Sequence, residues 1–112
     1  MLPKPFRLPS HRIPILLKNG KRMHSMLCSL IILQKKSDET SQFAVIIPHK
    51  LSKKAVLRNR TKRLLVETIH HQLPTLTNGF DVIVMAKKIL ATEKLQDVEP
   101  QLVLLLQKVK LM

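Results

Sequence analysis

Hydrophobic positions along the chain fall into two kinds of run, which together predict helices alternating with strands. Apolar residues at helical spacing mark three segments, and short apolar runs bounded by polar or turn residues mark the strands. Helices are expected at 11–19, 53–72 and 92–110, and strands at 21–24, 25–34, 42–48 and 80–86. This α-β-β-β-α-β-α order predicts an α+β fold with a small mixed sheet of about four strands and two helices on one face.

A few residues set the expected ends of these elements. Ser10 is expected to cap the first helix and Gly20 to end it, and Ser52 is a plausible N-cap for the middle helix. Proline lacks a backbone N–H and interrupts a helix beyond its first turn. The last amphipathic segment is therefore expected to break or begin near Glu99, just before Pro100.

The middle helix is expected to have an apolar side and a cationic side. At about 100° per residue, one narrow stripe carries Leu57, Thr61, Leu64 and Thr68, with Leu65 at its edge. The opposite arc carries Arg58, Asn59, Lys62 and Arg63. The stripe can pack on a core while the cations face solvent. Because like charges on one face repel, an adjacent phosphate backbone would stabilise this helix.

Charge is distributed unevenly along the chain. The span from Thr40 to Val66 contains seven Lys or Arg residues and no Asp or Glu. Residues 1–66 hold fifteen cations and two acids, a net charge of +13, whereas residues 67–112 hold five of each, a net charge of zero. A solvated helix face is the simpler explanation of a charged stretch. Seven cations without one acid nevertheless favour a polyanionic partner.

Size and composition narrow the architecture. A chain of 112 residues that is 45% hydrophobic is expected to form one domain over 1–112, with the proline-rich residues 1–9 as an extended arm. No apolar run reaches the roughly 18 residues of a membrane span, and prolines interrupt the apolar region that a signal peptide would need. We therefore expect a soluble cytoplasmic protein.

The sequence offers no catalytic constellation. Paired carboxylates, a Ser/His/Asp set and a glycine-rich phosphate loop are not found, and the histidines lack metal-ligand spacing with Cys or acids. Cys28, the single cysteine, lies in an apolar run, which favours a buried strand residue over a nucleophile. A binding protein without catalytic or metal-ligating residues of its own is expected.

Residues 54–65, with the sequence Lys-Ala-Val-Leu-Arg-Asn-Arg-Thr-Lys-Arg-Leu-Leu and followed by Glu67, resemble the signature of the bacterial ribonuclease P protein subunit. The pattern of that family is Lys-Ala-Val-x-Arg-Asn-Arg-x-Lys-Arg, then Leu and Glu. Two features depart from it. The family usually has Lys-Lys-Val-Gly where residues 50–53 read Lys-Leu-Ser-Lys, and Val66 stands where an Arg commonly precedes the Glu. The order of elements also fits, so the resemblance covers most of the chain.

The resemblance implies a ribosomal-protein-like fold with a left-handed β-α-β crossover, the opposite of the general preference. It implies a protein subunit of an endoribonuclease that matures the 5′ end of tRNA, in which the RNA subunit and Mg²⁺ perform the hydrolysis. The expected partners are ribonuclease P RNA, in a 1:1 complex with a protein monomer, and precursor tRNA. The residues expected to bind RNA are Lys50, Lys53, Lys54, Arg58, Asn59, Arg60, Lys62 and Arg63.

In the same family, aromatic residues on the first helix and the central strand typically face a cleft for the 5′ leader of precursor tRNA. Alignment on Gly20 places Ile13, Leu17, Cys28 and Ile31 at those positions, and the chain has no Tyr or Trp. Base stacking on aromatics contributes about 1–3 kcal/mol per base, so leader binding is expected to be weaker or to use apolar packing and cations. The candidate cleft residues are Ile13, Leu17, Lys21, Arg22, Ile31, Phe43 and His49, of which Phe43 suits the core better.

Two other interpretations stay open. A ribosomal-protein-like or RNA-chaperone domain that binds another structured RNA would have the same composition, and only the motif at 54–67 argues against it. A basic helix for membranes or DNA is disfavoured, because its outer arc has no Trp or Phe to insert into lipid and the elements do not resemble a helix-turn-helix. No membrane or DNA partner is therefore expected.

Overall fold

The computed structural model describes residues 2–36 and 38–109, which form three α-helices and a four-stranded sheet joined by short 3-10 turns. The helices are α1 (Ile13–Asn19), α2 (Ala55–Gln72) and α3 (Leu95–Lys108). The strands are β1 (Lys21–His24), β2 (Cys28–Gln34), β3 (Gln42–Ile46) and β4 (Phe80–Ala86). The predicted α+β class and order of elements are confirmed.

The strands form one mixed sheet in the order β1-β2-β4-β3. β2 pairs antiparallel with β1 and β4, and β3 pairs parallel with β4. Parallel neighbours require a crossover connection, which α2 supplies between β3 and β4. The left-handed sense that the resemblance implies for this crossover stays a prediction. The apolar run of β2 follows from its central position, since the successive residues Leu30 and Ile31 are both fully buried, one on each face.

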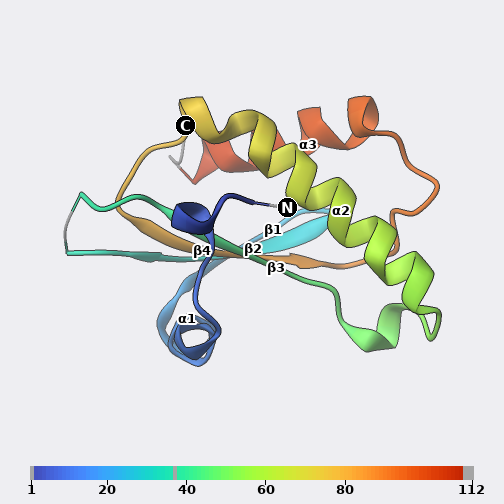
Figure 1. Ribbon diagram of the computed structural model, residues 1–112, viewed down its shortest axis with the longest axis horizontal. Coiled ribbons are helices and arrows are strands. Elements are labelled where there is room, and N and C mark those ends of the chain that lie inside the picture. The colour runs from blue at the N-terminus through green and yellow to red at the C-terminus, as the bar shows by residue number, and fades with distance from the viewer. Residues whose placement is uncertain (1, 37, 110–112) are drawn as a thin grey trace.

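Helices cover both faces of the sheet (Figure 1). α2 and α3 pack on one face, as predicted, and α1 packs on the other. The larger core cluster, on the α2 and α3 side, includes Leu30, Phe43, Leu65, Ile69, Val84 and Leu102. The smaller cluster, on the α1 side, is made by Leu8, Leu16, Ile31 and Ile83. The inner side of α2 is therefore packed in the core, and its outer side faces solvent.

Gly20 ends α1, as predicted, at a point where only glycine fits. The end of α1 approaches β2 so closely that a Cβ atom on Gly20 would lie 2.6 Å from the backbone oxygen of Leu16 and 2.7 Å from Cγ2 of Ile31. Both neighbours are fully buried, so neither can move away without disturbing the core. The missing side chain lets the chain pass directly from α1 into β1.

Several predicted boundaries are wrong, and local hydrogen bonds explain two of the three described here. Ser10 begins a 3-10 turn over Ser10–Arg12 and makes no capping bond. β2 begins at Cys28 rather than Ser25, because the Ser25 backbone N–H donates to the Cys28 carbonyl at 2.9 Å and closes the turn after β1. The N-cap of α2 is Lys54, not Ser52, and the Ser52 hydroxyl instead accepts a hydrogen bond from the Lys54 N–H at 3.1 Å.

α3 continues through Pro100, so the predicted break near Glu99 is wrong. Proline inside a helix costs about 3 kcal/mol. Buried side chains nevertheless lie on both sides of Pro100, with Val98 before it and Leu102 after it. The gain from packing this apolar stripe on the sheet outweighs the lost backbone hydrogen bond.

The buried side of α2 is rotated relative to the predicted stripe. Its buried residues are Thr61, Leu65, Thr68 and Ile69. Leu57 and Leu64, expected at the centre of the stripe, are half-buried at its edge. The rotation has a structural cause, because α3 packs against α2 and covers the side that carries Ile69.

The N-terminal segment lies against the sheet. Leu2 and Leu8 are buried, and the Leu8 backbone N–H donates to the Phe43 carbonyl at 2.9 Å. The segment contains one 3-10 turn, Lys4–Phe6, and its Arg7 forms a parallel bridge with Phe43. It therefore covers the outer edge of β3, an edge that would otherwise present unpaired backbone groups.

Candidate RNA-binding surface

The outer side of α2 carries a group of exposed polar and cationic side chains. We call Asn59, Arg60, Lys62 and Arg63 the basic ridge; all four are exposed. Asn59 and Arg63 are four residues apart and therefore share one face of the helix, while Arg60 and Lys62 lie on its two flanks. The opposite side is fixed by the fully buried Thr61 and Leu65. The ridge thus rests on a helix that the core holds in place.

The turn that leads into α2 extends this surface. Lys50, Lys53 and Lys54, here called the basic turn, are also exposed. Figure 1 shows the amino-terminal end of α2 and this turn projecting beyond the sheet. Among the residues that the structure describes, no carboxylate lies within 4.0 Å of a charged nitrogen of the ridge or the turn. Seven of the eight side chains predicted to bind RNA are therefore exposed around one end of α2.

Arg58, the eighth predicted residue, does not lie on the outer arc, so its predicted placement is wrong. It is half-buried, and its Nη1 donates to the Ser52 carbonyl at 2.6 Å. The error has a simple geometric cause. Arg58 precedes the fully buried Leu65 by seven residues, almost two helical turns, and therefore points to nearly the same side of α2.

Two further lysines lie at the same end of the sheet and were missed in the sequence. Lys87 and Lys88 directly follow β4 and are exposed. Because β3 and β4 are parallel, the residues that follow these two strands lie at the same end of the sheet. His49 and this lysine pair therefore lie at the end where α2 begins. The Leu90 N–H also donates to Thr61 Oγ1 at 2.9 Å, which ties the loop after β4 to α2.

At this end of the sheet, a row of side chains crosses the face on which α1 packs. The strand registers align His24 with Ser29, Ser29 with Met85, and Met85 with Ile46. His24 is exposed, and Met85 and Ile46 are half-buried. His24 Nδ1 and Ser29 Oγ are 2.8 Å apart. In the neighbouring row, Ile31 and Ile83 are fully buried beside α1. In the row from His24 to Ile46 only Ser29 is buried, so that row is the more accessible of the two.

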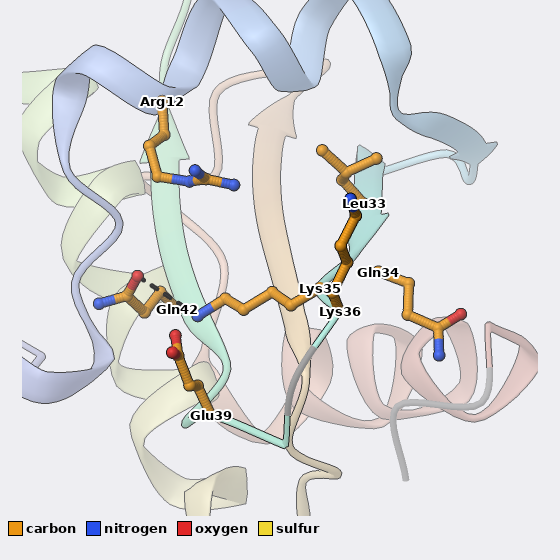
Figure 2. A pocket seen from close by; sticks show the side chains of 7 residues that line it. All are labelled: Arg12, Leu33, Gln34, Lys35, Lys36, Glu39 and Gln42. Carbon is orange, nitrogen blue, oxygen red and sulfur yellow. Dashed lines mark hydrogen bonds between the residues drawn. The ribbon is translucent and has the colours of Figure 1, made fainter.

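A hollow of about 520 Å³ lies at the opposite end of the sheet (Figure 2). It is lined by Arg12, Leu33, Gln34, Lys35, Lys36, Glu39 and Gln42. Two of its cations are engaged with a fully buried carboxylate, since Arg12 Nη2 lies 2.6 Å and Lys35 Nζ 3.2 Å from the oxygens of Asp81. Lys35 also donates to the Thr40 carbonyl at 2.9 Å. These contacts fasten the segment before α1 and the loop after β2 to β4, which indicates a structural role.

Comparison with known proteins identifies the family. The family model described as Ribonuclease P matches residues 3–110. The chain belongs to the ribonuclease P protein family. A ribonuclease P protein component from Synechocystis is 36% identical over 86 residues, which cover 75% of this chain and 68% of that protein. Another from Synechococcus is 31% identical over 116 residues and covers 100% of this chain and 87% of that protein.

Solved structures of ribonuclease P proteins share the fold. The protein from Thermotoga maritima superposes with a TM-score of 0.78 at 25% identity, and the match covers 91% of this chain and 96% of that one. The protein from Staphylococcus aureus gives a TM-score of 0.82 at 20% identity and covers 96% and 98%. The resemblance seen in the motif at 54–67 is therefore confirmed for the family and the fold.

The seven residues predicted to line a leader cleft in this ribonuclease P protein do not all lie together. Four of them meet where α1 packs on the sheet, and they are Ile13, Leu17, Arg22 and Ile31. Ile31 is buried, so its predicted place in an open cleft is wrong. Phe43 is buried in the core on the opposite face of the sheet, which confirms the core role that the sequence favoured. Ile13 is half-buried, and Leu17 is 36% exposed on α1. The remaining three are exposed, and they are Lys21, Arg22 and His49.

Lys21 and Arg22 lie on β1, whereas His49 follows β3 at the opposite edge of the sheet. They line a second hollow of about 570 Å³ with Phe80 and Val109. The guanidinium of Arg22 donates to the Leu17 carbonyl at 3.0 Å, which satisfies a backbone oxygen in the last turn of α1. Of the predicted cleft residues, only His49 lies at the end of the sheet where the basic ridge begins.

Cys28 is a buried strand residue in this ribonuclease P protein, as predicted. Burial raises the pKa of its thiol, and a hydrogen bond with Ser25 opposes that rise only in part. The thiol therefore lacks the low pKa of a nucleophile. Across residues 2–36 and 38–109, no three His, Cys, Asp or Glu side chains are grouped as metal ligands, and no helix has the length and hydropathy to cross a membrane.

Proposed function

We propose that this chain is the protein subunit of a cytoplasmic ribonuclease P and that the basic ridge and basic turn bind the catalytic RNA. The observation that carries the proposal is the set of seven exposed cationic and amide side chains around one end of α2, with no carboxylate of the described residues in ion-pair range. Arg60 and Arg63 can each grip a phosphate with two hydrogen bonds, whereas the lysines act as point charges. Asn59 can bond to sugar or backbone oxygens.

In this proposal the RNA subunit and its Mg²⁺ ions hydrolyse the phosphodiester bond, and the protein contributes binding in a 1:1 complex. The 5′ leader of precursor tRNA would lie over the accessible row that crosses the sheet from His24 to Ile46. Three observations support this path. The row lies at the end of the sheet where α2 begins, its Met85 and Ile46 offer apolar surface, and Lys87 and Lys88 supply cations beside it. Without an aromatic residue on this row, the leader would bind through apolar packing and charge rather than stacking.

Reconstitution of precursor-tRNA cleavage tests the proposal. The protein is added to a bacterial ribonuclease P RNA at low Mg²⁺, and the rate of 5′ maturation is measured. The parent protein should stimulate cleavage, and the Lys62→Ala, Arg63→Ala double variant should require a higher protein concentration for the same stimulation. Lys108→Ala is the matched control, because it removes an exposed cation from the end of α3.

The alternative is a ribosomal-protein-like or RNA-chaperone domain with the same basic surface. In that case the protein would not stimulate cleavage and would bind a fragment of ribosomal RNA more tightly than ribonuclease P RNA at the same ionic strength. The leader path is tested separately by comparing the affinity of the complex for precursor tRNA with that for mature tRNA. Lys88→Ala should reduce the preference for precursor tRNA, and a preference equal to that of the parent would contradict the path.

A further inference from the structure

We propose that Arg58 is a positioning residue, which holds the basic turn against α2 and contributes no phosphate contact of its own. The inference deepens the proposed function and rests on it. Arg58 differs from its neighbours, because it is half-buried whereas Asn59, Arg60 and Arg63 are exposed. Its Nη1 lies 2.6 Å from the Ser52 carbonyl oxygen, six residues earlier in the chain.

Ser52 is the residue through which the turn is held. Its hydroxyl accepts the Lys54 N–H at 3.1 Å, and its own N–H donates to the His49 carbonyl at 3.3 Å. The Arg58 guanidinium bonds to the third group, the carbonyl. A hydrogen bond from an ionised donor is about twice as strong as a neutral one. Arg58 therefore joins the helix to a segment that carries three exposed lysines and His49.

The start of α2 needs such a support. Among the described residues, no side-chain hydrogen bond caps it, and its first turn contains no acid. The N-cap is Lys54, a cation at the helix end where the macrodipole disfavours positive charge. Because the lysines of the basic turn repel one another, the turn would sample other arrangements if the bond from Arg58 to Ser52 were lost. Binding to RNA would then have to order the turn as well, which lowers affinity.

The salt dependence of RNA binding separates positioning from direct contact. Each phosphate contact contributes close to one to the slope of log Kd against log salt. Arg58→Ala should weaken binding to ribonuclease P RNA about tenfold, the effect of losing one charge-assisted hydrogen bond, without changing the slope. Arg63→Ala should lower the slope by close to one. Arg58→Lys keeps a charged donor for the Ser52 carbonyl and should restore most of the affinity.

Hydrogen exchange in the protein without RNA supplies the second measurement. The Leu57 amide, which bonds to the Lys54 carbonyl at 3.2 Å in the first turn of α2, should exchange faster in Arg58→Ala and return to the parent rate in Arg58→Lys. The amide of the buried Ile69 reports whether the rest of the helix is intact. A slope that falls by close to one in Arg58→Ala, or an unchanged Leu57 exchange rate, would overturn the inference. An Arg63→Ala protein that binds like the parent would instead overturn the proposed function.

Discussion

Thr61 lies inside the cationic motif of α2, yet it is fully buried and joins two parts of the fold. Its Oγ1 donates to the Leu57 carbonyl at 3.0 Å and accepts the Leu90 backbone N–H at 2.9 Å. We predict that Thr61→Val destabilises the protein, because valine keeps the shape of the side chain but leaves the Leu90 N–H buried without an acceptor. An unsatisfied buried backbone group costs about 1–3 kcal/mol, and this is the expected fall in the free energy of unfolding.

Thr68 provides a matched control on the same helix. It is also fully buried, and its Oγ1 donates to the Leu64 carbonyl at 2.9 Å, but no backbone N–H of residues 2–36 and 38–109 donates to it. Thr68→Val therefore removes only a bond within the helix, and the free energy of unfolding should change by less than about 0.5 kcal/mol. The difference between the two variants isolates the bond from Leu90 to Thr61.

Urea unfolding followed by far-UV circular dichroism is a suitable assay, since the chain contains no Trp or Tyr for fluorescence. Thr61→Val should show a lower midpoint with an unchanged m-value, the pattern of lost stability without a change in the surface exposed. Its RNA affinity, measured well below the unfolding midpoint, should equal that of the parent. Equal midpoints for Thr61→Val and Thr68→Val would refute the reasoning.

Three further predictions concern stability and reactivity. Asp81→Asn should lower the free energy of unfolding by about 3 kcal/mol in thermal or urea melts, because Arg12 and Lys35 lose their buried partner; a melt like that of the parent would contradict this. Leu65→Ala should lower the free energy of unfolding by about 2–5 kcal/mol and Leu64→Ala clearly less, since Leu65 is fully buried and Leu64 half-buried. A larger loss in Leu64→Ala would mean that the buried side of α2 is the stripe predicted from the sequence. Alkylation of Cys28 by iodoacetamide at pH 8 should be slow when folded and fast in urea, because burial raises the pKa of the thiol; equal rates would contradict this burial.

The elements of the fold were predictable because their patterns are strong. The apolar run at 80–86 became β4 with unchanged bounds, and Gly20 ends α1 as expected. Predictions were wrong where two local preferences compete, and where the neighbouring element decides which side of a helix is buried. Pro100 is tolerated because the side chains around it are buried, and the buried side of α2 follows the position of α3, which a helical wheel does not contain.

The candidate surface was predictable where residues are close in the sequence. The cations from Lys50 to Arg63 lie together because one turn and one helix carry them. Arg58 was misplaced, although its spacing of seven from Leu65 already indicated the inner side. Lys87 and Lys88 were missed because their position at the end of the sheet where α2 begins depends on the parallel pairing of β3 with β4, which only the folded chain establishes.

The number of phosphate contacts made by α2 is the most direct test of the central claim that the basic ridge binds ribonuclease P RNA. It is measured as the slope of log Kd against log salt for the parent, the Lys62→Ala, Arg63→Ala double variant and Lys108→Ala. Two lost phosphate contacts should lower the slope by about 1.4–1.8 in the double variant, and Lys108→Ala should match the parent. An unchanged slope in the double variant would contradict the claim and place the RNA on another surface.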